Sequence, residues 1–144
     1  MNKGIAIFSA LFIFLIIGLV SCAKKEAAQT PFNRIQGKWK LVKTATDDNG
    51  NKLIDDYEIH PVPSVQDNEI TFNKDLSGIE TNVYNGVTST PLYFTWAIIS
   101  QDSVWCAYTG HDTLTYYLIS VTSGTLALQT NTRFGLAAYY YNRK

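Results

Sequence analysis

From residue 34 to the end of the chain, short segments in which apolar and polar residues alternate follow one another. In the first of them Gly37, Trp39 and Leu41 share one face, and lysines lie on the other. A period of two is typical of a β-strand with one buried face, and no segment shows the longer period of an amphipathic helix. The predicted strands are 34–43, 68–72, 79–84, 91–99, 103–109, 113–121, 125–130 and 134–143.

Tight turns such as Asn85-Gly86 and Ser123-Gly124 join most of these segments, so neighbouring strands are expected to pair antiparallel. The pattern therefore predicts an all-β domain, either a sandwich or an eight-stranded antiparallel up-and-down β-barrel. We favour the barrel because closure removes the exposed edges of a sheet rich in Val, Tyr and Trp. An eight-stranded barrel has an interior that side chains fill, or that holds one small ligand.

The N-terminal 21 residues have the three parts of a secretory signal peptide: Lys3, an apolar run from Ile5 to Leu19, and a small residue before Cys22. The run is too short for an ordinary membrane-spanning helix. "LVSC" resembles the bacterial lipobox, which implies cleavage before Cys22 and acylation of its thiol, with palmitate among the acyl groups expected. An uncleaved, tilted anchor helix is the alternative.

Residues 22–33 are therefore predicted to be a lipidated N-terminus and linker, and residues 34–144 the barrel domain. This lipid anchor is expected to hold the protein in a Gram-negative cell envelope. Ala23 after the cysteine favours the outer membrane, by analogy with other lipoproteins.

The remaining chain is nearly neutral. The whole sequence has 12 basic and 12 acidic side chains, and removal of Lys3 leaves one excess negative charge. Nucleic-acid binding needs a strongly basic face, so it is excluded as a function class. Cys106 is the only cysteine besides Cys22, which excludes an internal disulfide in the mature chain and a zinc knuckle.

Catalysis has little support in the sequence. Ser103, His111 and Asp112 can be drawn as a triad, but no Gly-x-Ser-x-Gly elbow accompanies them. Cys106 lies in a predicted strand and is expected to be inert. A metal site of His60, His111 and Cys106 would need three distant segments to converge. We expect no enzyme activity, no cofactor and no metal.

The acidic segment after the first strand has oxygen donors at the spacing of a calcium loop, but the glycine that such a loop requires is replaced by Lys52. We therefore interpret "DDNGNK" as a turn. The donors are Asp47, Asn49, Asn51, Asp55 and Glu58.

The Gly37-x-Trp39 pair in "IQGKWKLV" resembles the signature of the lipocalins. With "EITFNKDLSG", "FTW", "YYLISV", "TLAL" and "YYYNRK", the domain is similar to the lipocalin-like domains of bacterial envelope lipoproteins. The resemblance implies that Trp39 closes the barrel floor and that a basic residue near the C-terminus packs on it. Arg143 is the first candidate for this residue and Arg133 the second. The chain lacks the disulfides and the C-terminal helix of secreted lipocalins.

A set of aromatic residues is the leading candidate for ligand binding, because rings with a few hydroxyls suit a small apolar ligand. These residues are Phe94, Trp96, Tyr108, Tyr117 and Tyr140. The leading function is non-enzymatic binding of such a ligand at the membrane. In the alternative the rings fill the barrel, which then serves as an accessory module for another envelope protein. Tyr139 and Tyr141 would be exposed and form a contact patch.

Overall fold

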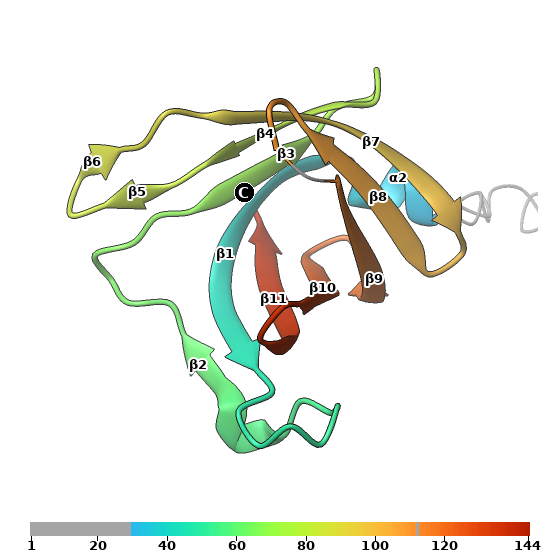
Figure 1. Ribbon diagram of the computed structural model, residues 1–144. Helices are drawn as coiled ribbons and strands as arrows, with labels where there is room; N and C mark the ends of the chain where they lie inside the picture. Colours follow the sequence, from blue (N-terminus) through green and yellow to red (C-terminus); the bar gives the residue numbers. More distant parts are fainter. Residues whose placement is uncertain (1–29, 112) are drawn as a thin grey trace, which may run out of the picture.

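The computed structural model describes residues 30–111 and 113–144, and its long strands curl around a common interior (Figure 1). Each strand pairs antiparallel with the next, and the last pairs with the first, so the sheet closes into a barrel. The predicted eight-stranded antiparallel barrel is confirmed, and the sandwich is wrong. The barrel strands are β1 (Gly37–Thr46), β3 (Glu69–Phe72), β4 (Ser77–Thr81), β7 (Leu92–Ser100), β8 (Ser103–Tyr108), β9 (Thr113–Val121), β10 (Thr125–Thr132) and β11 (Gly135–Arg143).

Short elements lie outside the barrel wall. A 3-10 helix, η1 (Asp56–Glu58), leads into β2 (Ile59–Pro61), which pairs with the far half of β1. The hairpin of β5 (Val83–Tyr84) and β6 (Val87–Thr88) projects from the barrel (Figure 1). Asn85 and Gly86 both have positive φ in its turn, as the sequence predicts. The predicted strand 79–84 is thus two strands, β4 and β5.

A five-residue helix, α2 (Pro31–Ile35), precedes the barrel. Thr30 caps it and Pro31 occupies its first turn, where a missing N–H costs nothing. Residues 31–33 belong to the predicted linker and residues 34 and 35 to the first predicted strand; the sequence predicts no helix here, because one turn is too short to show a helical period. Packing stabilises α2: Ile35 is fully buried, and its carbonyl accepts a hydrogen bond from Trp39 Nε1 at 2.7 Å. No helix in the described ranges is long and apolar enough to span a membrane.

One end of the barrel, which we call the closed end, is filled by aromatic side chains. Trp96 stacks on Phe32 of α2, with ring centroids 5.2 Å apart, and meets the edge of Phe72. Phe94 lies over Gly78, where a Cβ would come within 2.1 Å of the ring, so glycine creates the space for it. Trp96 Nε1 donates to the carbonyls of Asn73 and Ser77.

At the floor of the closed end, residues from the start and the end of the described chain contact each other. The Arg143 guanidinium lies 4.2 Å from the centre of the Trp39 ring and donates to the carbonyls of Arg34, Gln36 and Ser123. A Cβ on Gly37 would sit 2.5 Å from Arg143 Nη1, so only glycine leaves room for the stack. Arg143 therefore packs on Trp39, which is the position that the resemblance implies for a basic residue near the C-terminus.

Replacing Arg143 by lysine is expected to lower the free energy of unfolding by about 2 kcal/mol. The compact ammonium group of lysine cannot donate to three carbonyls and cover the Trp39 ring at the same time, as the planar guanidinium group does. Arg133→Lys is the matched control, since Arg133 stacks only on Phe134, which is 74% exposed. Urea unfolding of the three proteins measures the difference. Equal losses in both variants would contradict the structural role of Arg143.

The acidic loop is held by its own carboxylates. Glu58, fully buried, accepts from the backbone N–H groups of Asp48, Asn49 and Asp55, and Asp47 accepts from those of residues 51 and 52. The oxygens that the sequence spaces like calcium ligands are thus occupied by N–H groups of the loop.

Candidate ligand cavity

A cavity of about 580 Å³ occupies the end of the barrel opposite α2. Most of its residues come from the late part of β1, the start of β3, the end of β4, the start of β7, the end of β8 and the start of β9, which are the strand ends remote from the aromatic floor, and β11 adds Tyr139 and Tyr141. The interior is therefore filled at one end and hollow at the other. The apolar and aromatic lining residues are Leu41, Ile70, Leu92, Leu114, Tyr108, Tyr116, Tyr139 and Tyr141.

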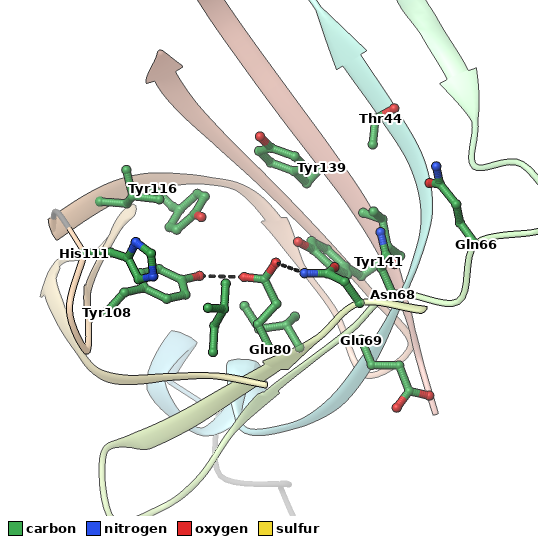
Figure 2. A pocket seen from close by; sticks show the side chains of 15 residues that line it. Thr44, Gln66, Asn68, Glu69, Glu80, Tyr108, His111, Tyr116, Tyr139 and Tyr141 are labelled. Carbon is green, nitrogen blue, oxygen red and sulfur yellow. Dashed lines mark hydrogen bonds between the residues drawn. The ribbon is translucent and has the colours of Figure 1, made fainter. Parts of the chain in front are cut away.

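The four lining tyrosines supply most of the ring surface (Figure 2). Burial raises the pKa of each phenol above its ordinary value, most strongly for Tyr108 and Tyr141. The phenols are accordingly protonated near neutral pH and present O–H donors within a largely apolar space. Tyr116 and Tyr139 meet edge to face, with ring centroids 6.3 Å apart.

A carboxylate, that of Glu80, lies among these rings. Glu80 in β4 lies directly opposite Ile70 in β3, and opposite residues of paired strands point to the same face of a sheet. The Ile70 side chain is buried in the barrel interior, so the Glu80 side chain points inward as well. The Tyr108 hydroxyl donates to Glu80 Oε2 at 2.8 Å, a bond drawn in Figure 2. Asn82 Nδ2 donates to the other oxygen at 3.2 Å. Two neutral donors thus orient one negative group inside the cavity.

Of the five aromatic residues predicted to bind ligand, Tyr108 alone lines the cavity. Phe94 and Trp96 do face the interior, at 3% and 1% exposure, but they belong to the packed closed end. Their rings touch Phe72, and the ring of Phe94 also packs against Tyr108, with centroids 5.0 Å apart. They form the wall beneath the cavity.

The predicted interior positions of Tyr117 and Tyr140 are wrong. Tyr117 is 46% exposed on the outside of β9, and its neighbour Tyr116 faces inward. In β11, Tyr139 and Tyr141 line the cavity, so Tyr140 between them lies on the other face, and the predicted exposed patch of Tyr139 and Tyr141 is wrong as well. Adjacent tyrosines give both faces of a strand the same character, so alternation does not fix which face is buried.

The sequence did not identify Glu80 as a cavity residue, because the apolar residues of 79–84 predict that the opposite face of the strand is buried. Ile79 and Val83 suggest an inward face that excludes Glu80, whereas the structure turns Gly78 and Glu80 inward. Gly78 was the available signal, because a glycine within a strand often marks a close approach by a neighbouring group. The Phe94 ring makes that approach here.

The residues considered for catalysis or metal binding do not form a site. Ser103 begins β8 at the closed end, whereas His111 follows the other end of that strand at the cavity; Asp112 lies outside the described residues. Burial raises the pKa of the Cys106 thiol to about 12, so it is not a thiolate near neutral pH. Within 30–111 and 113–144, no three His, Cys, Asp or Glu side chains are placed to hold a metal ion. Cys22 lies outside the described residues.

Comparison with known proteins identifies the family. A search of curated proteins gives no significant match. Lobster apocrustacyanin A1 is 11% identical, with a TM-score of 0.46; the alignment covers 78% of this chain and 62% of the lobster chain. Bovine odorant binding protein, solved with a selenium-containing odorant, is 13% identical, with a TM-score of 0.45 and coverage of 85% and 78%. The profile of the lipocalin-like domain matches residues 35–128, most of the barrel, and the chain belongs to this lipocalin-like domain family.

Proposed function

We propose that this protein binds a small, mostly apolar molecule in the open end of its barrel, without catalysis. The cavity carries the proposal: about 580 Å³ lies within the size range of small-molecule sites, and eight of its fifteen lining residues are apolar or aromatic. The packed closed end supports it, because the aromatic floor gives the cavity a defined depth instead of a channel through the barrel. Small hydrophobic ligands are typical of lipocalins, which agrees with this proposal.

We also propose that acyl chains on Cys22 anchor the protein to the outer membrane, so that the ligand is captured next to a lipid surface. The lipobox-like sequence before Cys22 supports this part. More than one acyl chain would make the attachment lasting, since each buried methylene contributes about 0.8 kcal/mol.

Native mass spectrometry of the purified protein, followed by denaturation of the same sample, tests ligand binding. We expect an added mass that disappears on denaturation, either as purified or after incubation with an envelope lipid extract. A bare protein mass under both conditions would contradict the proposal.

An accessory role for another envelope protein is the second candidate. It is favoured by large apolar side chains exposed on the outside of β7 and β9, namely Tyr93, Ile99, Tyr117 and Ile119. A bare protein mass in the native spectrum would shift the preference to this role.

A further inference from the structure

We infer that the cavity selects a ligand with a cationic nitrogen, such as an amine attached to an apolar or aromatic body, and that Glu80 pairs with that nitrogen. This inference rests on the proposed function, since it names the chemical class of the molecule that the cavity binds.

The Glu80 carboxylate has unused capacity to accept hydrogen bonds. A carboxylate can accept about four hydrogen bonds, and Glu80 receives one on each oxygen, from Tyr108 and from Asn82. Both donors are neutral side chains. They fix the orientation of the carboxylate and leave its negative charge, with acceptor sites to spare, among the lining residues of the cavity.

Among the described residues, no ion pair gives Glu80 a positive counter-charge. The ion pairs of the described residues join Lys38 and Lys144 to Glu69 and Lys40 to Asp67, and none of them includes Glu80. His111 also lines the cavity, but it makes no ion pair with Glu80. Glu80 is half-buried, and a bound ligand that covered it would remove its carboxylate from water, which costs free energy unless a partner compensates the charge. A ligand cation would supply that partner.

The aromatic rings of the cavity also favour a cation near Glu80. Tyr116, Tyr139 and Tyr141 lie around Glu80 in Figure 2 and belong to the same cavity. The face of an aromatic ring carries negative potential and attracts ammonium groups. Rings and carboxylate therefore favour the same ligand group, while Leu41, Leu92 and other apolar side chains accommodate its body.

A matched series of probes tests the inference by isothermal titration calorimetry on the full chain at neutral pH: 4-phenylbutylamine, 4-phenylbutanol and 4-phenylbutanoate. They share one apolar body and differ in the charge of the end group. We expect the amine to bind about tenfold more tightly than the alcohol, or better, and the carboxylate to bind more weakly than both. Glu80→Gln keeps the shape and removes the charge, so it should abolish the preference for the amine.

Glu69→Gln is the control, because Glu69 borders the same cavity but is already paired with lysines; this variant should keep the preference. Equal affinity for amine and alcohol in the natural protein, or an unchanged preference in Glu80→Gln, would overturn the inference and leave apolar binding intact. Absence of binding by all three probes would overturn the inference, and native mass spectrometry then decides separately on the proposed function. If Glu80→Gln does not fold, the probe series on the natural protein alone decides.

Discussion

Replacing Trp96 by alanine is expected to lower the free energy of unfolding by about 3–5 kcal/mol, a large part of the stability of a domain this size. Trp96 is 1% exposed, stacks on Phe32 and meets Phe72 edge to face. Its indole N–H also donates to two backbone carbonyls, both at 3.1 Å. Alanine would leave a void between the helix and the barrel and remove the donor from both carbonyls.

The matched control is Tyr93→Ala, three residues earlier in the same strand, where the ring is 59% exposed. Its loss should be well below that of Trp96→Ala, because the ring is already largely in water. Urea unfolding followed by circular dichroism gives both values. A loss below about 1 kcal/mol for Trp96→Ala would show that the closed end is loosely packed and tolerates a hole.

Alkaline pH is expected to destabilise the protein steeply. Burial raises the pKa of Tyr108, Tyr116, Tyr139 and Tyr141 above the value of about 10 that phenols have in an unfolded chain. Below pH 10 both states hold these protons, and the stabilisation is complete. As the pH rises further, the unfolded chain loses phenolic protons that the folded chain keeps. Each such phenol lowers the free energy of unfolding by up to about 1.4 kcal/mol per pH unit.

Unfolding in urea at a series of pH values from 8 to 11 measures this slope, and absorbance at 295 nm follows phenolate formation. Tyr141→Phe keeps the ring but removes one ionisable group, so its slope above pH 10 should be shallower. Tyr117→Phe is the control, since Tyr117 is exposed. A stability that stays flat to pH 11, or phenolate formation by all tyrosines near pH 10 in the folded protein, would contradict burial of the cavity tyrosines.

The fold was predictable because barrel strands and turns are local signals. Alternation identified eight strands, and residues such as Asn85-Gly86 marked turns. The closing pair was not local: Trp39 and Arg143 meet because β1 pairs with β11, and the resemblance to lipocalins pointed to this contact. The helix at Pro31–Ile35 was not predicted, because it is too short to show a helical period in the sequence. Tertiary packing of Ile35 and Phe32 against the core stabilises it.

The cavity was only partly predictable. A strand with tyrosines on both faces has no unique buried face, so the assignments of Tyr117 and Tyr140 were each wrong by one residue. The sequence also left a hollow interior and a filled one as alternatives. The structure combines them, because large rings such as Phe94 and Trp96 gather at one end and leave the other end open.

The most direct test of the central claim, that the open end of the barrel is the binding site, is the variant Leu92→Trp. Leu92 lines the cavity at the start of β7, and an indole there would occupy part of the space without disturbing the closed end. Calorimetric titration with 4-phenylbutanol should show that binding is lost or weakened by at least about tenfold, while the melting temperature stays within a few degrees of the natural protein. Unchanged affinity in a folded Leu92→Trp protein would place the binding site elsewhere and contradict the account.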